Sequence, residues 1–184
     1  MNWILASGSP RRRELLEMLG VPDLTIRPAK GPERATPGAG PEQTVRELAL
    51  HKAQEVAQTC APEDIVIAAD TIVYLDGVIL GKPKDTADAA RMLAALSGRE
   101  HTVYTGDETR QAAEHTAVRF RTLTPEEIAR YIATGEPMDK AGAYGIQGRG
   151  ALFVEHLDGD YFNVMGLPLC RLGQLLNELG VELL

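Results

Sequence analysis

The chain has 184 residues, of which 44% are hydrophobic and 24% charged, an ordinary balance for a globular protein with its own core. Its formal net charge of −7 argues against a general nucleic-acid-binding protein, because such proteins usually carry a basic surface. No apolar run approaches the ~20 residues that cross a bilayer, and the short N-terminal run lacks the basic flank of a signal peptide. We therefore expect a single domain over residues 1–184, located in the cytoplasm, with neither membrane nor nucleic acid as a partner.

The N-terminal stretch predicts a strand, a turn of small residues and a helix. Trp3 to Ala6 is apolar and is followed by Ser7-Gly8-Ser9, where backbone N–H groups can come close to a ligand. Pro10 suits the first turn of a helix, and Ser9 before it suits the N-cap. Arginines 11 to 13 follow at once, so this helix start favours an anion, in particular phosphate. The alternative is an ordinary capped helix with solvated arginines.

A loop rich in proline and glycine covers residues 28–41 and carries Glu33, and a helix is expected from about Pro41 to Thr59. Lys52 falls inside the apolar stripe of that helix, between Leu48 and Val56. A lysine in this position either extends along the apolar surface to solvent or points into a polar cleft. Both interpretations remain open at this stage.

The apolar run from Asp64 to Ala69 predicts a central strand that is covered on both faces. Asp70 and Thr71 end the run, and a carboxylate at the end of a buried strand is costly unless it meets a cation, a metal or a proton-transfer task. Asp76-Gly77 then predicts a tight hairpin turn. Lys82, which follows the hairpin, is either a phosphate ligand or a solvated loop lysine.

The rest of the chain predicts alternating helices and strands around two loops. Helices are expected from about Thr86 to Ser97, after the N-cap Thr124 and after Pro168. Strands are expected at 101–105 and 117–122, with a polar loop at 106–115 between them. Strands 152–154 and 161–164 should form a second hairpin. Before this hairpin, residues 136–150 form a glycine-dense loop around Gln147, which can both donate and accept hydrogen bonds. Such density suggests a backbone that lies close to something, although a merely flexible loop is the alternative.

The candidate side chains together suit a polyphosphate bound with a divalent metal, Mg²⁺ or Mn²⁺. Hard cations are held by a few carboxylates while the substrate phosphates supply further ligands. Lysine and arginine then stabilise the charge that develops, and phosphoryl transfer requires no nucleophilic side chain. The cations are Arg11, Arg12, Lys52 and Lys82, and the carboxylates are Glu33 and Asp70.

Several separated motifs in the right order resemble the Maf family of nucleoside triphosphate pyrophosphatases. They are Leu5–Leu16 (LASGSPRRRELL), Ala69–Val73 (ADTIV), Gly81–Pro83 (GKP), Leu96–Gly98 (LSG), Pro137–Ala151 (PMDKAGAYGIQGRGA), Gly159–Tyr161 (GDY) and Val164–Pro168 (VMGLP). The resemblance implies hydrolysis of a nucleoside triphosphate between the α- and β-phosphates. It also implies an α/β fold, in which a bent mixed β-sheet is flanked by helices and two lobes surround a central cleft, and a homodimer.

The resemblance further implies roles for individual residues. Asp70 would be the general base, and Glu33 would hold the metal together with Asp70, although Pro32 replaces one member of the acidic pair usual in the family. The phosphate ligands would be Arg11, Arg12, Lys52 and Lys82, and the small-residue turn before the first helix adds Ser7 and Ser9 as candidates.

Base choice is the last implication of the resemblance. The subgroup that prefers dTTP and UTP carries Arg, Thr and Gln at its selectivity positions, which here are Arg11, Thr71 and Gln147, whereas a subgroup that prefers 7-methyl-GTP lacks this pattern. Two rival hypotheses remain: a pyrophosphatase for modified nucleotides, including modified purine nucleotides, and a non-enzymatic interaction protein in cell division or septum formation.

Overall fold

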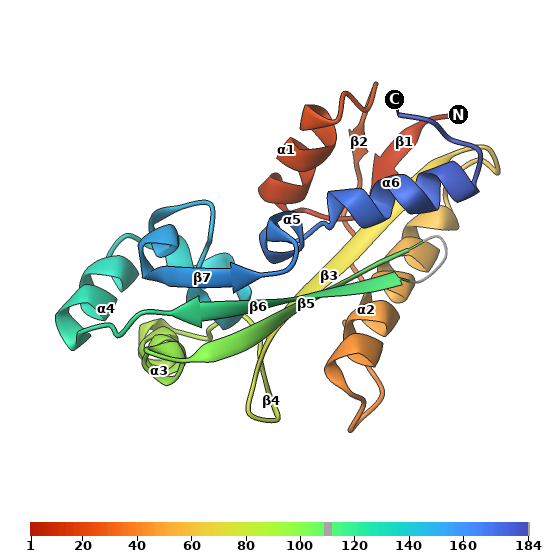
Figure 1. Cartoon of the computed structure of the whole chain (residues 1–184). Helices are drawn as coiled ribbons and strands as arrows, with labels where there is room; N and C mark the ends of the chain where they lie inside the picture. The colour runs from red at the N-terminus through yellow and green to blue at the C-terminus, as the bar shows by residue number, and fades with distance from the viewer. Residues whose placement is uncertain (109–111, 184) are drawn as a thin grey trace. The chain divides into compact units, whose positions relative to one another are not determined.

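The computed structural model describes residues 1–108 and 112–183. Within these residues, hydrogen bonds join seven strands in the order β2-β1-β3-β5-β6-β7, with β4 paired to β3 (Figure 1). Parallel and antiparallel pairs occur in this sheet together with α-helices, so the predicted α/β class with a mixed sheet is confirmed. Two compact units divide the chain: the first holds Met1–Asp70, Thr105–Glu114 and Gly166–Leu184, and the second holds Thr71–Tyr104 and His115–Met165. The bend of the sheet and the cleft between lobes stay predictions.

The first unit is built on parallel strand pairing. β1 (Trp3–Leu5) pairs in parallel with β2 (Thr25–Ile26) and with the first residues of β3 (Ile65–Leu75). Parallel neighbours need crossover connections, which α1 (Pro10–Met18) and α2 (Pro41–Ala57) provide. Both helices begin at the predicted prolines, and α6 (Leu169–Glu178) also belongs to this unit. No helix of the described chain is both long enough and apolar enough to cross a membrane.

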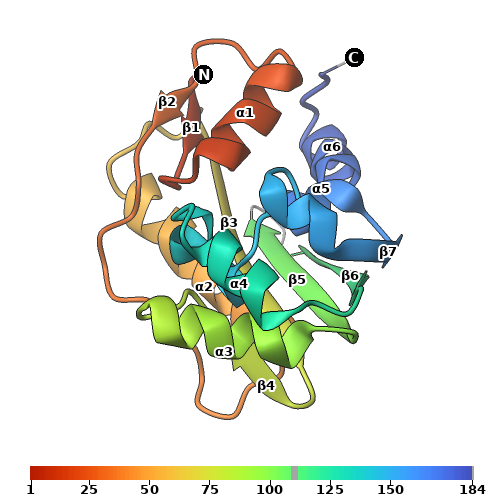
Figure 2. The ribbon, with the colours of Figure 1, turned by 90° about the vertical axis from the view of Figure 1, so that its left-hand side faces the viewer.

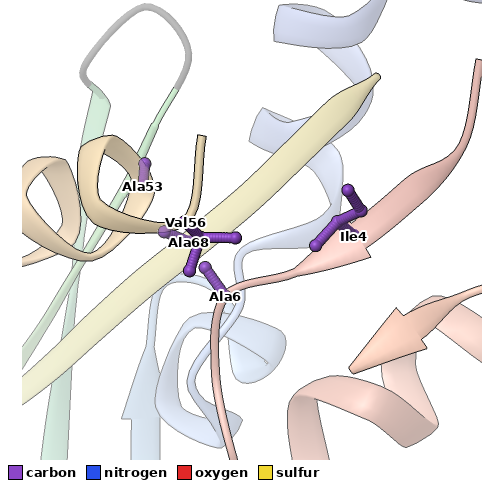
Figure 3. Packing of buried hydrophobic residues seen from close by; sticks show 5 residues of the cluster. All are labelled: Ile4, Ala6, Ala53, Val56 and Ala68. Carbon is purple, nitrogen blue, oxygen red and sulfur yellow. The ribbon is translucent and has the colours of Figure 1, made fainter. Parts of the chain in front are cut away.

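A small apolar cluster fixes α2 on the sheet of the first unit. Ile4 and Ala6 from the β1 segment pack with Ala68 of β3 and with Ala53 and Val56 of α2 (Figure 3). These side chains are small and nearly inaccessible, so the helix lies close to the strands and its rotation about its own axis is restricted. This rotation determines where the polar residues next to Ala53 and Val56 point.

The second unit is mainly antiparallel. The end of β3 forms a hairpin with β4 (Val78–Leu80), and the turn residues Asp76 and Gly77 have φ of 48° and 84°, as the predicted Asp-Gly turn requires. β5 (Glu100–Glu108) and β6 (Ala112–Phe120) both continue into the first unit, and β6 pairs with β7 (Val154–Asp158). α3 (Thr86–Leu96) and α4 (Pro125–Ile132) lie side by side (Figure 2). α4 begins with the predicted capping box between Thr124 and Glu127.

Aromatic rings anchor the glycine-dense segment in the second unit. Phe120 meets Tyr144 and Phe153 edge-on, with ring centroids 4.7 and 5.8 Å apart. The segment forms three short 3₁₀ helices, η1 (Glu136–Asp139), η2 (Ala141–Ala143) and η3 (Arg149–Phe153). A merely flexible loop is therefore excluded.

Several sequence predictions about secondary structure are wrong. The predicted strand 152–154 is displaced, because η3 extends to Phe153 and β7 runs over Val154–Asp158. Residues Tyr161–Met165 form a short helix, α5, instead of the second strand of a hairpin, because the Asp160 side chain accepts the N–H of Phe162 at 2.7 Å and so starts a helical turn. The predicted loop 106–115 is largely strand, since β5 reaches Glu108 and β6 begins at Ala112; residues 109–111 lie outside the described chain.

Candidate active site

Lys52 is the centre of a three-residue charge cluster in the first unit. Its Nζ atom forms an ion pair with Oδ1 of Asp70 and another, at 2.8 Å, with Oε1 of Glu33. The side chains of Lys52 and Asp70 are only 17% and 13% exposed, whereas that of Glu33 is 63% exposed. Lys52 therefore points into a polar site and does not extend to solvent, which decides between the two interpretations of its sequence position.

Asp70 lies inside β3, whereas the sequence predicted it at a strand end. The strand continues to Leu75 because the following residues, which include Ile72 and Val73, favour strand structure and because the end of β3 pairs with β4. A carboxylate that is largely withdrawn from water loses hydration energy, and the ammonium group of Lys52 offsets that loss. The ion pair therefore links a residue of α2 to a residue of β3 in the interior of the first unit.

Glu55 of α2 holds the loop that carries Glu33. Its two carboxylate oxygens accept the backbone N–H groups of Lys30 and Gly31 at 2.7 and 2.8 Å. These backbone hydrogen bonds are the main reason why the pKa of Glu55 lies below its ordinary value. A Cβ atom on residue 31 would lie 2.5 Å from Oε2 of Glu55, so a side chain there would displace the Glu55 carboxylate from this position.

Glu47 holds the same loop on the other side of Glu33. Its carboxylate accepts the N–H and the hydroxyl of Thr36 at 2.7 and 3.0 Å, and the first of these bonds is the largest cause that lowers the pKa of Glu47. Glu33 is thus placed opposite Lys52 by two fixed points on α2. Neither Glu47 nor Glu55 was predicted from the sequence, because both look like ordinary solvated helix residues there.

The N-terminal stretch folds largely as predicted. Pro10 opens α1 and Ser9 has the extended backbone of an N-cap, but its side chain forms no capping hydrogen bond. Instead, the buried hydroxyl of Ser7 accepts the N–H of Ser9 at 3.2 Å and Nη1 of Arg12 at 3.0 Å. Arg12 also donates from Nε to the carbonyl of Gly166 at 2.7 Å, so it links the first turn to the C-terminal part of the same unit.

Arg12 shares an electrostatic environment with the lysine cluster. Burial is the largest influence on its pKa and lowers it, while the negative charges of Asp70 and Glu33 act in the opposite direction. The neighbouring charge of Arg11, which is half-buried, lowers the pKa of Arg12 further. In the first unit, the carboxylates of Asp70 and Glu33 therefore interact electrostatically with Arg12 as well as with Lys52. Cations of this kind suit a bound polyphosphate, and the carboxylates suit its metal counter-ion.

Three further predicted residues belong to the second unit. Thr71 is half-buried on β3, Lys82 is exposed just after β4, and Gln147 is exposed between η2 and η3. The sequence missed Glu136, whose carboxylate accepts hydrogen bonds from the hydroxyl of Tyr131 and from two backbone N–H groups beyond Gln147. The glycine density of this segment is the signal that could have indicated it, because closely approaching backbone needs a partner.

The carboxylates of Asp70 and Glu33 suit a divalent cation. Both contact the same ammonium group, so two hard oxygen donors converge in this part of the first unit. Among residues 1–108 and 112–183, no three His, Cys, Asp or Glu side chains form a group that could hold a metal by themselves. Mg²⁺ is commonly held by one or two carboxylates with substrate phosphates as further ligands, and the residues present fit that arrangement.

Comparisons with known proteins show which sequences and structures this chain is similar to. Residues 2–179 match the family model described as Maf-like protein. The dTTP/UTP pyrophosphatase of Moorella thermoacetica is 54% identical over 97% of this chain and 95% of its own length. The dTTP/UTP pyrophosphatase of Bacillus cytotoxicus is 52% identical over 96% of this chain and 95% of its own. A nucleoside-triphosphatase structure from Mycobacterium abscessus aligns at 20% identity with a TM-score of 0.40, over 73% of this chain and 93% of its own.

Proposed function

The chain belongs to the Maf-like protein family, and from that premise we propose that it hydrolyses dTTP and UTP to the nucleoside monophosphate and pyrophosphate. The observation that carries the proposal is the ion pairing of one largely buried lysine with two carboxylates, Lys52 with Asp70 and Glu33. Relatives that are about half identical over nearly their full length are named dTTP/UTP pyrophosphatase, which supports this substrate class.

In the proposed reaction Asp70 acts as the general base. Its carboxylate takes a proton from the attacking water, the new P–O bond forms, and the α–β phosphoanhydride bond breaks, with its electron pair leaving on pyrophosphate. Lys52, which contacts Asp70, donates to the substrate phosphates as negative charge develops on them. No covalent intermediate is needed, because positioning and charge stabilisation supply most of the catalysis in phosphoryl transfer.

A divalent cation, Mg²⁺ or Mn²⁺, is proposed as the cofactor. Asp70 and Glu33 would hold it, and when bound it would neutralise phosphate charge and lower the pKa of a bound water. Glu33 is the more exposed of the two carboxylates and lies on a loop that α2 holds from both sides. Glu33 can therefore leave Lys52 and bind the cation, because its own side chain is exposed and Lys52 still contacts Asp70.

The remaining polar residues would bind and select the nucleotide. Phosphate binding is proposed for Arg11, Arg12, Lys52 and Lys82 and for the Ser7 and Ser9 region, where Arg12 is already tied to Ser7. Base selection is proposed for Arg11, Thr71 and Gln147. A homodimer and a cytoplasmic location complete the proposal, and light scattering in solution tests the first of these.

The experiment that tests the activity is a substrate panel. The protein is incubated with dTTP, UTP, GTP and a modified purine triphosphate, with Mg²⁺ or Mn²⁺, and pyrophosphate and orthophosphate are measured separately. We expect pyrophosphate from dTTP and UTP. Orthophosphate as the first product would contradict the proposed bond of cleavage, a preference for the modified purine would contradict the proposed base, and no hydrolysis at all would favour an interaction protein.

A further inference from the structure

The chain presents Gln147 at the tip of a tight turn. The N–H of Gly148 donates to the carbonyl of Gly145 at 3.2 Å, which closes a turn with Ile146 and Gln147 at its centre. Ile146 is buried, whereas Gln147 is exposed. The turn therefore holds the Ile146 side chain inside the second unit and places the Gln147 side chain at the surface of that unit.

One carboxylate fixes both ends of this turn. On the far side, Glu136 accepts the N–H groups of Arg149 and Gly150 at 3.0 and 3.2 Å. On the near side, it accepts the hydroxyl of Tyr131 at 2.8 Å, and the oxygen of that hydroxyl accepts the N–H of Gly145 at 3.1 Å. The side chains of Glu136 and Tyr131 together therefore connect the residues before and after Gln147.

The fit around this carboxylate is tight. A Cβ atom on residue 148 would lie 2.4 Å from Oε1 of Glu136, and one on residue 150 would lie 2.7 Å from the carbonyl oxygen of Gly145. Burial raises the pKa of Glu136. Hydrogen bonds from Arg149, Gly150 and Tyr131 more than offset this effect, so the pKa lies below its ordinary value. Burial also raises the pKa of Tyr131, which keeps its hydroxyl protonated as the donor.

We propose that Glu136 is a specificity-positioning residue, which fixes the turn 145–148 and thereby the direction of the Gln147 amide toward the base of the nucleotide. This inference rests on the proposed function, because it gives Gln147 a base to contact. A glutamine at position 136 would keep the shape but would turn an NH₂ group against backbone N–H donors, so one end of the turn would be released. Gln147 would then sample several directions.

The test is the ratio of kcat/KM for dTTP to that for GTP, measured for the wild type, Glu136→Gln and the control Glu155→Gln. Glu155 is exposed on β7 in the same unit. We expect Glu136→Gln to lower this ratio about tenfold and the control to leave it unchanged. A folded Glu136→Gln variant that keeps the wild-type ratio, even with all rates reduced equally, would overturn the inference.

A second variant covers the case in which Glu136→Gln does not fold. Tyr131→Phe keeps the ring against Phe153 but removes the link from Glu136 to Gly145, so it should lower the selectivity ratio by a smaller factor, about threefold. An unchanged ratio in folded Tyr131→Phe would contradict the inference in that case. Failure of the proposed function is a distinct result, since the wild type itself would then fail to release pyrophosphate from dTTP.

Discussion

The ammonium group of Lys52 lies 2.8 Å from Oε1 of Glu33, although Glu33 belongs to a loop without regular secondary structure. The contact is possible because Glu47 and Glu55, on the same helix as Lys52, hold that loop by its backbone on either side of Glu33. Helix α2 is in turn fixed by the packing of Ala53 and Val56 on the sheet. A continuous series of contacts thus leads from the apolar core to an exposed carboxylate.

The first prediction concerns the loop contact of Glu55. Glu55→Gln should raise the Mg²⁺ concentration for half-maximal dTTP hydrolysis roughly tenfold, because Glu33 would no longer be held in place. Metal titrations of initial rates measure this, with Glu63→Gln, an exposed residue of the same unit, as the control. Equal half-maximal concentrations in both variants would show that Glu55 does not position a metal ligand.

The second prediction concerns the cost of removing Lys52. Lys52→Met leaves the carboxylate of Asp70 largely buried without its cation, and we expect the free energy of unfolding to fall by about 2 kcal/mol. The double variant Lys52→Met/Asp70→Asn should recover part of this loss, because a neutral amide replaces the carboxylate. Urea denaturation of the three proteins is the measurement, and a double variant no more stable than Lys52→Met would contradict the mutual dependence of the pair.

The third prediction concerns pH and His101. Burial lowers the pKa of His101 from 6.5 to about 4. Its Nε2 atom lies 2.9 Å from the hydroxyl of Tyr144, and its Nδ1 atom has no hydrogen-bond partner among residues 1–108 and 112–183. Between the pKa of 6.5 in the unfolded chain and the pKa of about 4 in the folded protein, the unfolded chain binds the proton more readily. The free energy of unfolding should therefore fall as the pH decreases from about 6.5 to about 4, and His101 should cause no further loss below pH 4.

The size of this effect is about 3 kcal/mol, and the variant His101→Gln should lack it. The measurement is the free energy of unfolding in urea at a series of pH values, compared with His51→Gln, which changes an exposed histidine. A dependence between pH 4 and 6.5 that is equally steep in wild type and His101→Gln would contradict this account.

The fourth prediction is independent of activity. Gly173 lies inside α6, and a Cβ atom added there would meet no heavy atom of the described residues within 4 Å. Gly173→Ala should therefore stabilise the protein by about 0.5–1 kcal/mol, because alanine loses less backbone entropy in a helix. Thermal and urea unfolding check this, and a loss of stability would mean that the surroundings of α6 are tighter than described.

Local signals in the sequence were sufficient for much of the fold. Pro10, Pro41 and Thr124 located three helix starts, and Asp76-Gly77 located a hairpin. The prediction failed where a tertiary contact decides the conformation. α5 is the example: the Asp160 side chain starts its first turn, and the backbone N–H and C=O of Asp160 are held by the hydroxyl of Thr116, which is far away in the sequence.

In the candidate site, too, local signals were visible in the sequence and tertiary contacts were not. The unusual positions of Lys52 and Asp70 were visible in the sequence, because a charge interrupts an apolar pattern in each case. Their pairing was not visible, nor were the supporting roles of Glu55 and Glu136. These two glutamates bind backbone N–H groups, and such groups carry no signature in the amino-acid sequence that would reveal the partner.

The most direct test of the central claim is the turnover of dTTP by Asp70→Asn, measured as pyrophosphate release at saturating Mg²⁺ or Mn²⁺ beside the wild type. The substitution keeps the size of the side chain and removes the base, so kcat should fall by roughly 10²-fold or more while the protein stays folded. A folded Asp70→Asn variant that releases pyrophosphate at nearly the wild-type rate would contradict the assignment of the Lys52–Asp70–Glu33 cluster as the active site.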